Sequence, residues 1–135
     1  GLQDCLYLGN LNALRDWGHA KDYVEGMWMI LQQKKPEDFV FATGKTYTVR
    51  YFVEKAFSQL DIKILWKGKN LKECGIDQKS GKVIVKIDPK YFRPTEVDFL
   101  KGDASKAKKK LGWRPKTSLR SLVKEMIEHE LKLLN

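Results

Sequence analysis

The sequence is poor in cysteine and has no long apolar run. Its two cysteines, Cys5 and Cys74, are too few and too far apart for a zinc site or a disulfide framework, so we expect reduced thiols and a cytoplasmic protein. No apolar run approaches the about 18 residues that span a bilayer, so we expect no membrane contact. Residues 1–4 lack the basic and apolar regions of a signal peptide, and we expect them to continue a longer chain.

Arginine is also scarce. Five of the 26 basic residues are arginines, and lysine supplies most of the formal net charge of +9. Surface lysines usually form a solvated face, whereas the planar arginine fork suits phosphate and carboxylate oxygens. Each arginine is therefore informative about a ligand. The five are Arg15, Arg50, Arg93, Arg114 and Arg120.

The 135 residues are enough for one domain, or for one domain with part of a neighbour. Strand-like patterns occur at residues 3–8, 39–42, 62–66 and 83–87, and helical spacing of apolar residues occurs at 22–33, 49–60, 104–111 and 119–134. Residues 67–82 are polar and predict a surface excursion. The alternation predicts an α/β fold, or α+β for an isolated fragment, with a few short strands and about four helices.

Local signals also predict the ends of these helices. Thr48 and either Thr117 or Ser118 are suited to N-caps, as is Asp103 before the short lysine-rich helix. Gly112 is suited to the left-handed residue that ends that helix.

Two motifs imitate enzyme sites. Gly44-Lys45-Thr46 resembles the end of a phosphate-binding loop, but Phe39 stands where the first glycine of that loop is required, which argues against a triphosphatase. Tyr51 and Lys55 have the spacing of a dehydrogenase Tyr-Lys pair, yet no cofactor loop is near them. We interpret both motifs as structural.

His19 lies between Asp16 and Asp22, an arrangement that could suggest a metal site. No second histidine or cysteine lies at ligand spacing, so we expect no metal and interpret His19 as a structural residue at a strand-to-helix junction.

A basic run, residues 106–116, surrounds Trp113 and leaves a nucleic-acid-binding module open as an alternative. The opposing interpretation is a solvated lysine face. A third alternative is a non-catalytic oligomerisation domain, because several helices have strongly apolar faces.

The segment YFRPTEVD, residues 91–98, is the most distinctive polar stretch. It places an arginine and two carboxylates in a proline-stiffened turn after an apolar run, which suits ligand binding better than packing. Arg15 also lies outside the helical stripes, at a junction between predicted elements. These positions are where ligand sites concentrate.

The segments RDWGHAKDYV (residues 15–24) and YFRPTEVD (residues 91–98) closely resemble the GDP-mannose 4,6-dehydratase family. Shorter stretches at residues 9–11, 36–40, 42–44 and 102–113 extend the resemblance over essentially the whole chain. It implies an extended short-chain dehydrogenase/reductase, in which a Rossmann domain holds NADP and a smaller C-terminal domain binds the sugar nucleotide.

The resemblance covers only the C-terminal third to half of that family. It implies that residues 1–45 are the last elements bordering a missing Rossmann domain and that residues 46–135 form the sugar-nucleotide-binding domain. The catalytic Thr, Glu and Tyr-x-x-x-Lys of the family lie upstream, so we expect no catalytic residue, no bound cofactor and no activity in this chain alone.

The resemblance also implies roles for individual residues. Arg15 and Arg93 match arginines that contact the diphosphate, and Glu96 matches an acidic residue that contacts the ribose. Asn10 is close enough in sequence to Arg15 to face the guanosine. We therefore expect Arg15 and Arg93, 78 positions apart, to point into one pocket.

The implied parent enzyme is a lyase of fucose biosynthesis that converts GDP-mannose to GDP-4-keto-6-deoxymannose and water with bound NADP. C4 is oxidised, water is lost across C5 and C6, and hydride returns to C6. The implied partners are GDP-mannose and further copies of the parent enzyme in a homo-oligomer, without nucleic acid or membrane.

Overall fold

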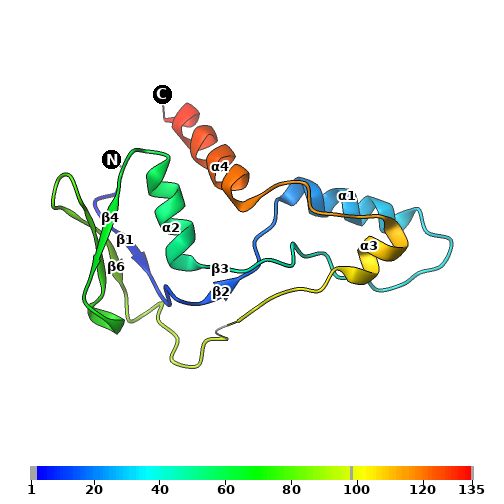
Figure 1. Ribbon diagram of the computed structural model, residues 1–135, viewed down its shortest axis with the longest axis horizontal. Helices are drawn as coiled ribbons and strands as arrows, with labels where there is room; N and C mark the ends of the chain where they lie inside the picture. The colour runs from blue at the N-terminus through cyan, green and yellow to red at the C-terminus, as the bar shows by residue number, and fades with distance from the viewer. Residues whose placement is uncertain (1–2, 98, 135) are drawn as a thin grey trace. The chain divides into compact units, whose positions relative to one another are not determined.

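The computed structural model describes residues 3–97 and 99–134, and the chain divides into two compact units (Figure 1). Unit 1 comprises residues 1–13 and 48–98, and unit 2 comprises residues 14–47 and 99–135. Each unit therefore combines two separate stretches of sequence. The predicted border with a Rossmann domain near residue 45 stays a prediction.

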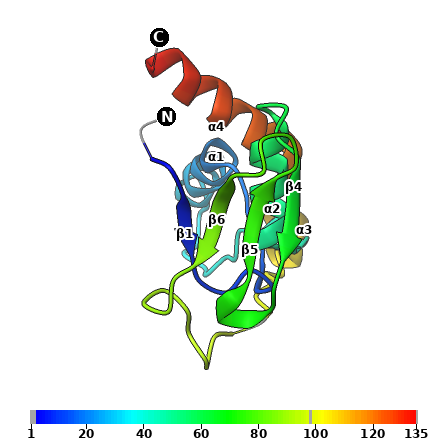
Figure 2. The ribbon, with the colours of Figure 1, turned by 90° about the vertical axis from the view of Figure 1, so that its left-hand side faces the viewer.

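Unit 1 contains a mixed sheet of four short strands in the order β1-β6-β5-β4 (Figure 2). The strands are β1 (Leu6–Leu8), β6 (Val83–Ile87), β5 (Cys74–Asp77) and β4 (Ile64–Lys67). β1 runs parallel to β6, and the other neighbours are antiparallel. β6 has the predicted bounds, β1 lies inside its predicted range, and β4 is displaced by one or two residues.

The expected surface excursion at residues 67–82 is wrong in part. It contains a short 3-10 helix, η1 (Asn70–Lys72), and β5, which lies between β6 and β4. Gly75 is buried there, and a Cβ on it would approach Ile64 Cγ2 to 2.9 Å and Trp66 Cζ3 to 3.0 Å. β5 thus requires glycine at position 75, and glycine has a low strand propensity. For this reason the sequence did not predict the strand.

Helix α2 (Val49–Ser58) belongs to unit 1 and confirms the predicted helix and its cap. The side chain of Thr48 accepts a hydrogen bond of 3.0 Å from the amide of Tyr51. Val53 of the helix and Val85 of β6 are both buried in the core of this unit. The apolar face predicted from the sequence is therefore the face that packs.

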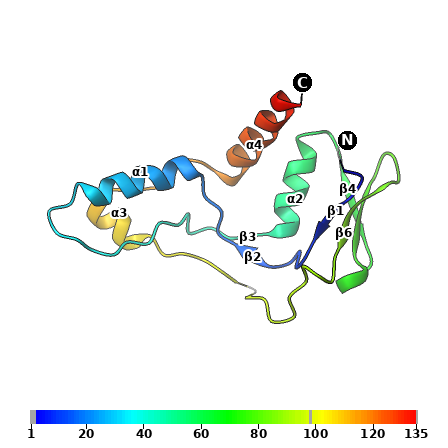
Figure 3. The same ribbon diagram turned by 180° about the vertical axis from the view of Figure 1, so that it is seen from behind.

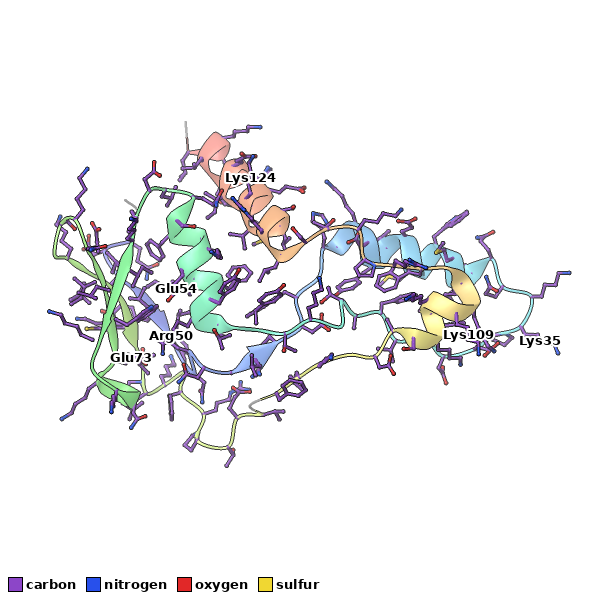
Figure 4. The ribbon with its side chains drawn as sticks, viewed as in Figure 1. Lys35, Arg50, Glu54, Glu73, Lys109 and Lys124 are labelled. Atoms are coloured by element: carbon purple, nitrogen blue, oxygen red, sulfur yellow. The ribbon has the colours of Figure 1, made fainter. Side chains whose placement is uncertain are left out.

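A polar network joins α2 to the sheet (Figure 4). Arg50 makes a two-pronged ion pair with Glu73, at 2.8 and 2.9 Å, and both side chains are mostly buried. The guanidinium also lies 4.6 Å from the ring centroid of Trp66, whose Nε1 donates to Glu54 over 2.7 Å. This paired geometry is the form in which a shielded arginine is stabilising.

Unit 2 is mainly helical. It contains β2 (Leu14–Arg15), α1 (Ala20–Leu31), α3 (Ser105–Leu111) and α4 (Leu119–Leu133), and β3 (Tyr47–Thr48) marks the passage to unit 1. α3 lies alongside α1 (Figure 3). Gly112 is left-handed at the end of α3, and Ser118 caps α4, as predicted.

Trp113 is the centre of unit 2 and is almost fully buried. Its ring stacks on Tyr23 at 6.2 Å and meets the edge of Phe41 at 4.8 Å between centroids. Its Nε1 donates to the backbone oxygen of Asp22 over 2.7 Å. The buried indole therefore has both an apolar surround and a partner for its polar group.

The predicted strand at residues 39–42 is wrong: this stretch belongs to no strand among the residues described. A strand needs a backbone partner, whereas here the side chains do the packing. Phe41 contacts Trp113 and Ala42 is buried, while Val40 is 54% exposed. A short apolar run cannot reveal from sequence whether a ladder partner is present.

Among the helices formed by the described residues, none is long and apolar enough to cross a bilayer.

Candidate functional site

The turn that carries Arg93 is held by Asn10. The Asn10 side-chain amide donates to the carbonyl of Arg93, and its oxygen accepts from the Arg93 amide, each over 2.9 Å. These two bonds bind the backbone of one residue to one side chain, across 83 positions of sequence. Asn10 thus fixes the position of Arg93, and its predicted contact with guanosine stays a prediction.

The neighbouring Gly9 allows this approach. A Cβ at Gly9 would lie 2.2 Å from the carbonyl oxygen of Tyr91, so no larger residue fits without displacement of the turn. Asp88 supports the turn from the other side, because its backbone oxygen accepts from the amides of Tyr91 and Phe92, each over 3.0 Å. The turn is therefore anchored to the ends of β1 and β6.

Arg93 and Glu96 occupy the two ends of one tight turn. The Glu96 amide donates to the carbonyl of Arg93 over 3.2 Å. Arg93 is exposed and Glu96 is half-buried. The second carboxylate of the predicted motif, Asp98, lies outside the described residues. An exposed guanidinium on a fixed backbone can bind an anion with little loss of backbone entropy.

Arg15 lies in β2 and is half-buried. One of its terminal nitrogens donates to the carbonyl of Leu14 over 2.8 Å. Arg15 belongs to unit 2, whereas Asn10, Arg93 and Glu96 belong to unit 1. The shared pocket of Arg15 and Arg93 stays a prediction.

Asp16 fills the loop that imitates a phosphate-binding motif. Its carboxylate accepts from the amides of Thr43 and Gly44, each over 2.9 Å, and from the Thr43 hydroxyl. A more distant bond of 3.4 Å comes from the Gly102 amide. The donors that would have to hold a phosphate are thus occupied by an internal anion, which agrees with the structural interpretation of the motif.

Two further residues of the conspicuous polar cluster are also structural. His19 is buried as the N-cap of α1: its Nδ1 accepts from the Lys21 amide over 3.0 Å, so in the neutral ring the opposite nitrogen donates to Glu125 over 3.1 Å. Asp22 is buried and accepts from the amides of Lys116 and Thr117.

The surroundings of this cluster shift two pKa values. Burial raises the pKa of Tyr23, and the nearby carboxylates of Asp16 and Asp22 raise it further. A hydrogen bond from Lys21 lowers the pKa of Glu125, and His19 adds to the effect. In both cases the shift favours the protonation state that the side chain ordinarily has at neutral pH.

The pair Tyr51 and Lys55 has the structural role expected. The Lys55 ammonium lies 5.0 Å from the centroid of the Tyr51 ring, over its face, and Tyr51 is partly exposed. This is a cation–π contact on a helix surface.

The basic run of residues 106–116 is partly neutralised. Lys106 and Lys110 both pair with Glu37, and Lys116 pairs with Glu25 over 2.6 Å. The carboxylates come from segments far away in sequence, and no local signal predicted them. This pairing weakens the argument for a nucleic-acid-binding surface.

The described residues contain no group of three or more histidine, cysteine or acidic side chains that could hold a metal ion.

Solved structures share the fold of this chain. A UDP-glucose 4-epimerase from Bifidobacterium longum, solved with NAD+ and UDP, matches 100% of the chain and 37% of its own length with a TM-score of 0.73 and 18% identity. RMD from Pseudomonas aeruginosa, solved with NADPH, matches 94% of the chain and 36% of its own length, with a TM-score of 0.70 and 14% identity. The chain therefore shares its fold with about a third of each of these structures.

Sequence comparison is more specific. A model of the GDP-mannose 4,6 dehydratase family matches residues 1–126. The chain is 60% identical to GDP-mannose 4,6 dehydratase of Dictyostelium discoideum and 54% identical to that of Homo sapiens, over 134 residues in each case. It therefore belongs to the GDP-mannose 4,6-dehydratase family. The two alignments cover 99% of this chain but only 38% and 36% of the relatives' own lengths, respectively. The chain thus spans little more than a third of the length of these relatives.

Proposed function

We propose that this chain is the substrate-binding portion of a GDP-mannose 4,6-dehydratase, and that it binds and orients the sugar nucleotide without reacting with it. The observation that carries the proposal is the family match over residues 1–126. The high identity to curated dehydratases along nearly the whole chain supports the same substrate class.

Arg93 is the central residue of the proposed site. Its exposed side chain would hold the diphosphate, and its backbone is fixed by Asn10. Arg15 would also hold the diphosphate, because the planar fork matches phosphate oxygens. Glu96 would accept hydrogen bonds from the ribose hydroxyls. Asn10 would act chiefly by positioning Arg93, with guanosine as its predicted further contact.

The chemistry of the parent enzyme would need residues outside this chain. Bound NADP would supply a hydride acceptor and donor for C4 and C6, and the NADPH in the structure of RMD supports a cofactor of this class. The four residues of the proposed site would bind the sugar nucleotide and would transfer neither a proton nor a hydride. They are Asn10, Arg15, Arg93 and Glu96. The chain by itself is therefore expected to have no turnover.

The setting proposed for the parent enzyme rests on its cysteines, the family resemblance and an exposed apolar stripe. The two free cysteines support a reducing cytoplasm and a role in fucose biosynthesis is implied by the family resemblance. An apolar stripe on α1 is exposed and supports packing against further protein, including other copies of the parent enzyme in a homo-oligomer. Its members are Val24, Met27, Trp28 and Leu31.

The test uses a family-length protein that contains this segment. Arg93→Ala should raise the KM for GDP-mannose by about 10- to 100-fold, the loss expected for one charged hydrogen-bond partner, with a smaller effect on kcat. Arg120→Ala is the matched control, because this arginine is exposed on α4 and has no assigned role. Formation of the 4-keto product is followed by mass spectrometry.

Three outcomes would contradict the proposal or part of it. The first is a family-length protein that binds GDP-mannose but forms no 4-keto product. The second is an equal KM for the Arg93→Ala and Arg120→Ala variants. Turnover by the 135-residue chain alone would refute its purely binding role.

A further inference from the structure

A broad groove in unit 2 contains none of the residues assigned to the sugar nucleotide. Its volume is about 910 Å³, and it lies between residues 42–45, 99–105 and 113–115 with Lys108 of α3. A volume of this size is typical of a small-molecule site. Four cationic side chains line it, and all four are exposed: Lys45, Lys101, Lys108 and Arg114.

The groove cations differ from three other lysines of the basic run. Lys106, Lys110 and Lys116 each form an ion pair with a glutamate. Within the described part of the chain, by contrast, none of the four groove cations takes part in an ion pair within 4.0 Å. Among the described residues of the basic run, Lys108 and Arg114 therefore line the groove without such a pair, and Lys45 of the Gly44-Lys45-Thr46 motif lines it too. Lys109 has no such pair with any described residue either, but it lies outside the groove lining.

The rest of the lining defines the ligand further. Among the described residues that line the groove, Asp103 is the one carboxylate, and its Oδ1 already accepts from the Ser105 amide over 2.9 Å. Four cations against one carboxylate leave a surplus of positive charge. Phe99 lines the same groove and is 56% exposed, so its ring is available for stacking.

We propose that this groove binds a phosphorylated small molecule of the nucleoside diphosphate class, at a site distinct from the one assigned to GDP-mannose. A multiply charged anion can gain several charge-assisted bonds from the four cations that line the groove. The side chains must supply the binding, because Asp16 already occupies the amides of Thr43 and Gly44. Phe99 provides the stacking surface for the base.

The 135-residue chain is titrated calorimetrically with GDP and, separately, with inorganic pyrophosphate. The groove variant is Lys108→Glu with Arg114→Glu. The matched control is Lys109→Glu with Arg120→Glu, which changes the net charge by the same amount at two exposed positions outside the groove lining. Lys109 is the immediate neighbour of Lys108 on α3 (Figure 4). Circular dichroism verifies that each variant is folded.

We expect the groove variant to lose about tenfold or more in affinity for both ligands, and the control to lose much less. Phe99→Ala should weaken GDP but leave pyrophosphate nearly unchanged, because only GDP has a base to stack. Arg93→Ala should retain groove binding, which separates this site from the proposed substrate site.

Three results would overturn the inference. One is an equal loss in the groove variant and its control, which would indicate a diffuse charge effect. Another is binding that depends on Arg93 and not on Lys108 and Arg114, which would assign the affinity to the substrate site. The third is the absence of saturable binding of either probe.

Discussion

At the scale of single residues, Asn10 has the clearest measurable role. Asn10→Ala removes both hydrogen bonds to the backbone of Arg93 and should lower the free energy of unfolding by about 1–2 kcal/mol. Asn10→Asp keeps the acceptor for the Arg93 amide but sets a carboxylate oxygen against the Arg93 carbonyl oxygen, so it should also lower the stability. Urea denaturation followed by circular dichroism measures both variants. Equal stability of all three proteins would show that the turn is held in another way.

Glu125 should make stability depend on pH. The hydrogen bond from Lys21 lowers the pKa of Glu125 in the folded protein, so its contribution is complete above the unfolded value of 4.5. That contribution is lost as pH falls through the lower, folded pKa. Stability measured by denaturation below pH 4.5 should therefore fall less steeply in Glu125→Gln. Glu130→Gln, a glutamate of the same helix, should keep the steeper fall of the unmodified chain.

Sequence reasoning succeeds where a residue acts on its near neighbours. Thr48, Ser118 and Gly112 have their predicted roles because a cap bonds within about one helical turn. It did not reveal the hydrogen-bond partners of Asn10 and Asp16, which lie far away in sequence. Asparagine after glycine indicates a turn, but nothing local indicates which backbone its side chain will hold.

At the scale of elements, Trp113 joins the segment after α3 to α1. Trp113→Ala removes an almost fully buried side chain and should cost about 3–5 kcal/mol. Trp113→Phe keeps part of the packing and loses the hydrogen bond to Asp22, so it should cost less. The control is Trp28→Ala on α1, because Trp28 is 62% exposed. Denaturation curves in which Trp113→Ala and Trp28→Ala coincide would contradict this assignment.

Elements were predictable when their own periodicity specified them. The helices followed from apolar spacing, and β6 followed from a run rich in valine and isoleucine. β5 was missed because its middle contains Gly75, and residues 39–42 were assigned to a strand although their role is side-chain packing. A strand is defined by its partner, and pairing between distant segments is not encoded in either segment alone.

At the scale of the whole molecule, the chain matches little more than a third of the length of its relatives. The exposed stripe of α1 should therefore promote association of the 135-residue chain at high concentration. Trp28→Lys with Leu31→Lys should reduce that association in sedimentation velocity experiments, because both side chains are largely exposed and apolar. Gln32→Lys with Gln33→Lys adds the same charge next to the stripe and should have little effect. Identical sedimentation of the two double variants would show that charge alone is responsible.

The family and the fold class could be inferred from the sequence because two long motifs and several helices are local patterns. The division into two interleaved units could not, because each unit joins stretches separated by more than 30 residues. The same distinction holds in the candidate site. Arg93 and Glu96 are neighbours in one turn, so the sequence predicts that they are close, whereas the fold brings Asn10 to Arg93 from a distant segment.

The carboxylate of Asp16 has a consequence for how the Gly44-Lys45-Thr46 loop could change. With Asp16 in place, the amides of Thr43 and Gly44 bind an anionic side chain of the same protein. A single substitution of Asp16 by glycine would convert this saturated loop into a vacant receptor beside Lys45. The exclusion of an external anion from these two amides thus depends on one side chain.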